Sequence, residues 1–290
     1  MNNVSFGKQT TVYFKKITRI AVRENAWKFV AFAAIIAAIV AAVVSKNMFK
    51  NFESTKSGFF TLASACIWLG IFNSIQSICK EHDIIRSEYR QGMKMSSYVC
   101  ANILYQAVLC LIQTIIIYVI CLAFGYFEGC PSDGAFMPAM VEYFITLYLL
   151  VFGSAVMGIM VSSVASNPTT AMTIMPFVLI LQLIMSGVLF VLEGFSEGVA
   201  YITFSKWGMS ALGSTANMNA IPHKLVLDLE QNQQTLQTAQ ILKQTFDSNL
   251  DSAYTQEAGK VLVAWLWCIG ITAVSAVVSI VSLKFKNRDS

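Results

Sequence analysis

Long runs of apolar residues separated by short polar stretches occupy most of this chain. Six of the runs reach about 20 residues, the length that an α-helix needs to cross a bilayer. They cover residues 26–45, 58–79, 97–124, 143–165, 168–192 and 261–283. Only Ser166-Asn167-Pro168 separates the fourth run from the fifth, and Asn is a good helix cap while Pro is tolerated at a first helical position. The pattern therefore predicts an all-α integral membrane protein with six transmembrane helices and a tight turn between the fourth and the fifth.

The apolar runs follow one another almost end to end, which predicts one transmembrane domain over residues 1–290. Within it we expect an amphipathic leading helix (1–25), helices one to five (26–192), an outer loop (193–259), and a last helix with a tail (260–290). Composition agrees, because 56% of the residues are hydrophobic and only 12% are charged, against about 25% charged in a soluble domain. The net charge of +4 does not indicate a nucleic-acid partner, since the basic residues flank the apolar runs.

The distribution of basic residues predicts the orientation. Most of the 20 lysines and arginines precede the first run, lie between the second and third runs, or follow the last run. Loops rich in Lys and Arg remain on the cytoplasmic side, so both termini should be cytoplasmic in a multi-pass protein of the cell membrane.

The first 25 residues have the pattern of an amphipathic helix. One face carries apolar residues and the other carries basic ones at a spacing of four; the apolar set is Phe6, Tyr13, Ile17, Ile20 and Ala21, and the basic set is Lys15, Arg19 and Arg23. Such a helix can lie on the inner membrane surface. Two interpretations stay open: a simple orienting anchor, or a helix that also touches a cytoplasmic partner.

The second cytoplasmic loop also has a helical pattern, over residues 81–94. Ile84, Ile85, Tyr89 and Met93 share one face with Glu81 and Glu88 at its edge, and Asp83, Arg86, Arg90 and Lys94 share the opposite face. Gly92 stands where a helix commonly ends. A plain linker needs no apolar stripe, so this stretch predicts a short helix that docks on another protein or lies at the interface.

The outer loop contains two further apolar segments. Residues 201–212 are too short to span and suit a re-entrant or interfacial piece. A second stripe predicts a helix that caps the membrane domain or docks an external partner; it consists of Leu225, Leu229, Leu236, Ala239, Leu242 and Phe246.

Motifs for chemistry are absent from the sequence. It contains no GxxxxGK[ST] phosphate loop, no HExxH zinc motif and no CxxC pair among its seven cysteines. The apolar runs hold almost no ionisable residues, which argues against a membrane enzyme or an ion-coupled carrier. We therefore expect no catalytic residues, no metal site and no cofactor on this chain, and a motor on a separate polypeptide or domain.

Two segments carry a resemblance to a known family. Residues 81–98, with the pattern Glu-x6-Glu-Tyr-Arg-x-Gly-x3-Ser-Ser-Tyr, resemble the coupling segment of ABC-type export permeases of the White and pleiotropic drug-resistance branch. The stretch from Ser163 through Asn167-Pro168 and Pro176 to Ser186-Gly187-Val188 is similar to the fourth-to-fifth helix turn and fifth helix of that family. The order of elements is also similar, and the lack of outer-loop cysteine pairs is typical of bacterial members.

The resemblance implies a dimer of two such domains, homomeric or heteromeric, each engaging an ABC nucleotide-binding subunit or domain that holds ATP and Mg. It implies a coupling role for Glu81, Ile84, Ile85, Glu88, Tyr89 and Arg90. It places Cys66, Leu69 and Asn73 in a substrate cavity and Val188 and Leu189 in a hydrophobic valve above it, with Val where relatives often have Leu. The expected function is outward movement of an amphipathic or hydrophobic substrate by alternating access; a non-transporting channel or regulatory membrane subunit is the alternative.

Overall fold

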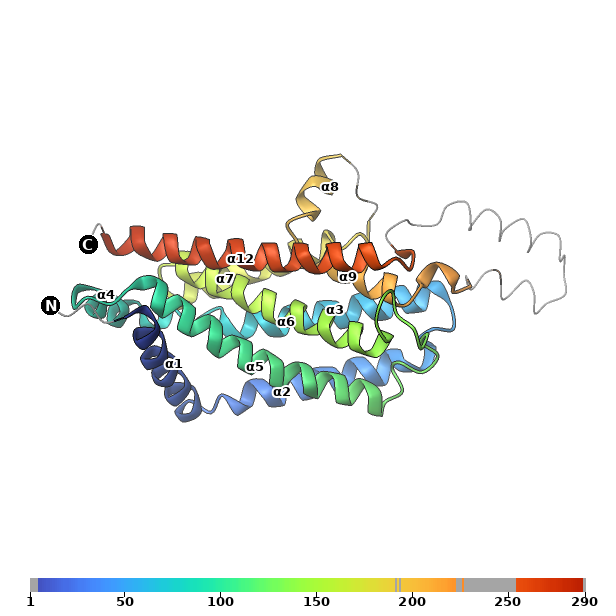
Figure 1. Ribbon diagram of the computed structural model, residues 1–290, viewed down its shortest axis with the longest axis horizontal. Coiled ribbons are helices and arrows are strands. Elements are labelled where there is room, and N and C mark those ends of the chain that lie inside the picture. Colours follow the sequence, from blue (N-terminus) through green and yellow to red (C-terminus); the bar gives the residue numbers. More distant parts are fainter. Residues whose placement is uncertain (1–4, 191, 193, 223–225, 227–253, 289–290) are drawn as a thin grey trace.

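Five long helices run side by side along the long axis of the molecule (Figure 1). The computed structural model describes residues 5–190, 192, 194–222, 226 and 254–288, and this part of the chain contains helices and no strands. The long helices are α2 (Trp27–Val44), α3 (Phe52–Ser74), α5 (Met95–Ala123), α6 (Ala139–Val164) and α12 (Ala258–Arg288). All five are long and apolar enough to cross a membrane. The all-α membrane fold class is therefore confirmed.

Helix α7 (Pro168–Ile184) occupies the fifth apolar run but is shorter than the sequence pattern predicts. It begins as expected, with the Asn167 side chain accepting a hydrogen bond from the Thr170 N–H at 2.8 Å. It ends at Ile184 because Gly187 adopts a left-handed conformation (φ 74°) and the Ser186 hydroxyl donates to the Leu183 carbonyl. The last residues of the run therefore lie beyond the helix.

The chain leaves the bundle after α7 and then returns to its interior. The short helix α8 (Phe195–Ala200) projects sideways from the bundle (Figure 1), and Phe195 is 88% exposed. Helix α9 (Phe204–Thr215) then packs against α3, α6 and α12 and is almost wholly buried. The predicted re-entrant or interfacial segment, 201–212, thus corresponds mostly to a buried helix of 12 residues. The predicted cap helix with Leu229 and Leu236 lies outside the described residues.

The closest approach in the bundle is between α3 and α6, where small residues face each other. A Cβ added at Gly70 of α3 would overlap the Ser154 hydroxyl and the Val151 carbonyl of α6. One turn or more away, a Cβ at Gly158 of α6 would overlap the Ser74 hydroxyl of α3, which donates to the Ala155 carbonyl at 2.6 Å. Small residues let helix backbones approach closely in a membrane, where no hydrophobic force draws helices together.

One end of the bundle carries the short helix α4 (His82–Arg90), the start of α1 (Phe6–Arg23) and the end of α12, and we refer to it as the α4 end. Helix α1 lies across the long axis of the bundle, unlike α2, which follows it (Figure 1). Asn25 makes the turn between them with a left-handed φ of 60°. Lys15, Arg19 and Arg23 are exposed and Tyr13, Ile17 and Ile20 are half-buried, as the amphipathic pattern predicts, whereas Phe6 of the predicted apolar face is 46% exposed.

At the opposite end, a buried carboxylate organises the connection between α5 and α6. Glu142 is 0% exposed and accepts hydrogen bonds from the backbone N–H groups of Ala135, Phe136 and Met137 at 2.8–3.0 Å. Its Oε2 atom also accepts the Thr215 hydroxyl of α9 at 2.8 Å. A buried charge is stable only when hydrogen-bond donors surround it. Here three donors are backbone N–H groups of the loop before α6, and the fourth is a hydroxyl of α9.

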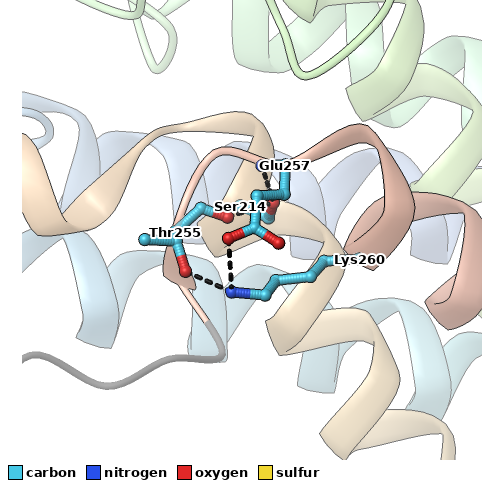
Figure 2. Close-up of polar contacts among 4 residues, drawn as sticks. All are labelled: Ser214, Thr255, Glu257 and Lys260. Atoms are coloured by element: carbon cyan, nitrogen blue, oxygen red, sulfur yellow. Dashed lines mark hydrogen bonds and ion pairs between the residues drawn. The ribbon is translucent and has the colours of Figure 1, made fainter.

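A smaller polar cluster joins the end of α9 to the start of α12 (Figure 2). The Ser214 hydroxyl donates to the Thr255 carbonyl at 2.8 Å and accepts the Glu257 N–H at 3.4 Å. The Lys260 ammonium donates to the Thr255 hydroxyl and pairs with Glu257 at 3.2 Å. These contacts hold the end of α9 against the start of α12.

We predict that Gly70→Val destabilises the protein by about 1–3 kcal/mol, because its side chain overlaps a backbone carbonyl that no rotamer change can move. Thermal unfolding in detergent, followed by circular dichroism, measures the effect. Gly270→Val on α12 is the matched control, since a Cβ there meets nothing within 4 Å. Equal melting temperatures for the two variants would contradict the proposed close contact.

We further predict that Glu142→Gln lowers the free energy of unfolding by about 2–3 kcal/mol. The carboxylate only accepts hydrogen bonds, whereas a carboxamide must turn its NH2 group toward at least one of the same donors. Unfolding in denaturant measures the loss, and Glu128→Gln at an exposed position is the control. An equally stable Glu142→Gln protein would show that this carboxylate does not organise the loop.

Candidate functional site

Helix α4 follows directly from α3, and a hydroxyl from α6 supports the transition. Between the end of α3 at Ser74 and the start of α4 at His82, the chain forms a short 3-10 turn, Cys79–Glu81. The Ser162 hydroxyl of α6 accepts hydrogen bonds from the N–H groups of Ile78 and Cys79 at 3.0 and 3.1 Å. These amides would otherwise be buried without partners. The position of α4 is thereby tied to both α3 and α6.

The inner face of α4 packs on a small apolar cluster that we name the α4 cluster. Its buried members are Ile78, Ile85, Met93, Met95, Tyr98, Val99, Ile159 and Leu283, from α4, α5, α6, α12 and the two turns that flank α4. Ile85 is 0% exposed, and Tyr89 packs against the cluster edge. Side chains from the three long helices α5, α6 and α12 therefore meet in the cluster that buries Ile85.

Two acidic residues of the predicted coupling set form polar contacts inside this protomer. Glu81 accepts the Tyr98 hydroxyl at 2.9 Å, and Glu88 pairs with Lys16 of α1 at 2.7 Å. Burial, then the nearby Glu88 charge and a hydrogen bond to it, raise the pKa of Tyr13 to about 12, so Tyr13 remains neutral beside that pair. Helices α1 and α4 are consequently linked by an ion pair.

The outer face of α4 is open. Ile84 is 51% exposed, and Asp83, Ser87 and Arg90 are exposed as well. The sequence pattern placed Ile84 on the same face as Ile85, and that placement is wrong, because two consecutive helical positions lie about 100° apart and packing buries only one. This face of α4 therefore presents one apolar side chain among polar and charged ones.

The predicted cavity residues do not lie together on one surface. Cys66 and Leu69 are 0% and 4% exposed and pack inside the protomer. Asn73 is half-buried, and its amide exchanges hydrogen bonds with Gln113 of α5 at 2.6 and 3.1 Å. The exposed face of α3 instead presents Trp68 and Phe72, which are 41% and 42% exposed. Trp68 and Phe72 are four positions apart on the helix that carries Asn73, and this spacing indicates in the sequence that they share one face.

The predicted valve residues lie in the turn after α7. Val188 is partly buried against the main core, and Leu189 is 53% exposed. On α7 itself the exposed large apolar residues are Met172, Phe177, Ile180, Leu181 and Ile184. The exposed apolar residues of α3 and α7 therefore differ from the predicted cavity and valve residues.

The described residues contain no group of three or more His, Cys, Asp or Glu side chains that could hold a metal ion. The cysteines are free thiols, and most of them are buried.

Comparison with known proteins identifies the family. The family model for the ABC-2 type transporter matches residues 14–216, well over half of the chain, from α1 to the end of α9. A curated relative, an ABC transporter ATP-binding/permease protein of Mycobacterium tuberculosis, is 25% identical over 156 residues, which is 52% of this chain and 18% of that protein. The chain thus spans under a fifth of its relative's length. Because the family model covers most of its helices, this chain belongs to the ABC-2 type transporter family and is a membrane permease component.

Proposed function

We propose that this chain is the permease of an ABC exporter, which moves an amphipathic or hydrophobic substrate outward when ATP and Mg bind to a separate nucleotide-binding subunit or domain. The observation that carries the proposal is the structure of α4. Its inner face packs into a cluster with side chains of the three long helices α5, α6 and α12, while Ile84 and its charged neighbours remain exposed. A partner that moves on ATP binding could dock on that face and transmit its movement to the bundle. The fused ATP-binding and permease name of the mycobacterial relative is consistent with such a partner.

The orientation that we propose puts α4 and both termini in the cytoplasm. The α4 end carries the basic residues of α1 and α4 and those at the end of α12, namely Lys284, Lys286 and Arg288, as the positive-inside rule requires. Nucleotide-binding domains work in the cytoplasm, so this orientation makes the exposed face of α4 accessible to them.

Alternating access would use two copies of the membrane domain, identical or related. The exposed apolar residue Trp68 of α3, with Phe177 and Ile180 of α7, would then face a cavity between the protomers. An apolar, aromatic lining favours an amphipathic or hydrophobic substrate. We propose Asn73 as a polar contact and Val188 with Leu189 as the valve. Cys66 and Leu69 could join the lining only if α3 rotates during the cycle.

We predict that Ile84→Asp reduces ATP-driven transport by about tenfold or more, because a charge replaces an apolar contact at the centre of the docking surface. Inside-out vesicles that contain the permease and its ATPase measure the uptake of a labelled amphiphile. Ile84→Val keeps the apolar contact and should transport normally, and both variants should reach the membrane because residue 84 is outside the core.

The same vesicles test the direction and the alternative function. ATP-dependent accumulation inside inverted vesicles supports export. Flux that is the same with and without ATP would indicate a channel, and no flux at all with normal ATPase binding would indicate a regulatory subunit. Unchanged transport by Ile84→Asp would refute the docking role of α4.

We also predict that Lys16→Glu releases α1 from α4, because it places two carboxylates together. Loss of a partly buried ion pair of about 1 kcal/mol should speed amide hydrogen exchange in α1 about fivefold. The double variant Lys16→Glu with Glu88→Lys restores the pair in reverse and should restore protection. Lys15→Glu, at an exposed position on the same helix, is the control. If the double variant exchanges as fast as the single one, the ion pair does not hold the two helices together.

A further inference from the structure

A pocket of about 430 Å³ opens beside the turn between α1 and α2. One wall consists of the end of α1 and the start of α2, and the other consists of the end of α3 and the first turns of α5. Its volume is within the range of sites that bind small molecules. It lies inside one protomer, and of the three predicted cavity residues only Asn73 lines it.

The position of the pocket corresponds to the surface layer of a bilayer. Helix α1 lies across the bundle axis, as an amphipathic helix does in the plane of a membrane surface (Figure 1). The long helices start their crossing where α1 ends, and the pocket is formed at that boundary. Phe29, Phe32 and Phe72 line it and are 38%, 58% and 42% exposed, so its apolar side is continuous with the lipid-facing surface.

One residue that lines the pocket, Gln106, has a buried polar atom without a partner among the described residues. Gln106 is 2% exposed, and its Nε2 atom donates to the Asn73 carbonyl at 3.3 Å. Its Oε1 atom is buried and accepts no hydrogen bond from the part of the chain that the structure describes. A buried acceptor without a donor costs about 1–3 kcal/mol. The site therefore suits a ligand that brings an N–H or O–H group to this oxygen.

The mouth of the pocket carries charges of both signs. Lys28 and Lys80 contribute ammonium groups, and Glu24 contributes an exposed carboxylate. The Glu81 carboxylate also lines the pocket but already accepts the Tyr98 hydroxyl. Cations that attract a phosphate, beside acceptors that attract an ammonium, match a zwitterionic head group.

We propose that this pocket binds the head group of one membrane phospholipid that has a primary ammonium, such as phosphatidylethanolamine. The phosphate lies near Lys28 and Lys80, the ammonium donates to Gln106 Oε1 and faces Glu24, and the acyl chains extend along Phe29, Phe32 and Phe72. Phosphatidylcholine fits less well, because its trimethylammonium group has no N–H to donate. The site lies at the α4 end, which is the inner leaflet in the proposed orientation, and binding there requires no transport cycle.

Native mass spectrometry of the full-length protein, with phosphatidylethanolamine and phosphatidylcholine of the same acyl chains, tests the proposal. We expect one tightly bound phosphatidylethanolamine per chain, with an affinity about tenfold above that for phosphatidylcholine, as expected for one hydrogen bond to a charged group. Gln106→Leu should remove this preference.

Variants at the exposed mouth of the pocket test the proposal even if Gln106→Leu does not fold. Lys28→Gln and Glu24→Gln leave the core intact and should each weaken binding of phosphatidylethanolamine several-fold. Lys15→Gln, exposed on α1 and outside the pocket lining, should bind like the unchanged protein.

Two results would overturn the proposal. One is equal affinity for the two lipids in the unchanged protein, which would indicate nonspecific lipid contact. The other is unchanged binding in both mouth variants. The test uses no transport measurement. The lipid-binding proposal can therefore fail while the proposed export function stands, and the export function can fail while the lipid-binding proposal stands.

Discussion

The close approach of α3 and α6 is the contact on which the other helices depend. A bilayer supplies no hydrophobic force between helices, so their association relies on van der Waals contact and hydrogen bonds. Gly70 and Gly158 let the two backbones approach, and the Ser74 and Ser162 hydroxyls add hydrogen bonds across the same interface. Helix α9 packs on both helices, and α12 packs on α6 and α9. The transition from α3 to α4 is supported by the same pair, because Ser162 belongs to α6.

Helix α4 has two attachments to the rest of the molecule. Through Ile85 and the α4 cluster it is joined to α5, α6 and α12, and through Glu88 it is joined to α1. The buried attachment is apolar and close-packed, so a displacement of α4 would also displace the side chains that it contacts. The ion pair is half-exposed and weaker, which allows α1 to separate from α4 at low cost.

The long helices could be predicted from the sequence because bilayer thickness sets their length and composition. The facing of individual residues could not, because lipid-exposed and protein-buried positions of a membrane helix are equally apolar. The sequence therefore did not indicate that Cys66 and Leu69 are buried inside the bundle, or that Trp68 and Phe72 are exposed. Ile84 and Ile85 are neighbours in a helix of nine residues, and only tertiary packing decides which of them is buried. The contact of Glu142 with Thr215 joins residues that are 73 positions apart in the chain, which no local pattern indicates.

The early end of α7 has a consequence for the state in which this chain can exist. Its 17 residues span roughly 25 Å, short of the roughly 30 Å hydrocarbon layer. The irregular backbone that follows, around Gly187 and Leu189, carries exposed apolar side chains at the side of the bundle. Lipid tails cannot hydrogen-bond to such a backbone, and unsatisfied peptide groups in hydrocarbon cost several kcal/mol each. Contact with bare lipid tails is therefore unfavourable for this strip, and any polar or protein surface that covers it would lower the free energy of the chain in the bilayer.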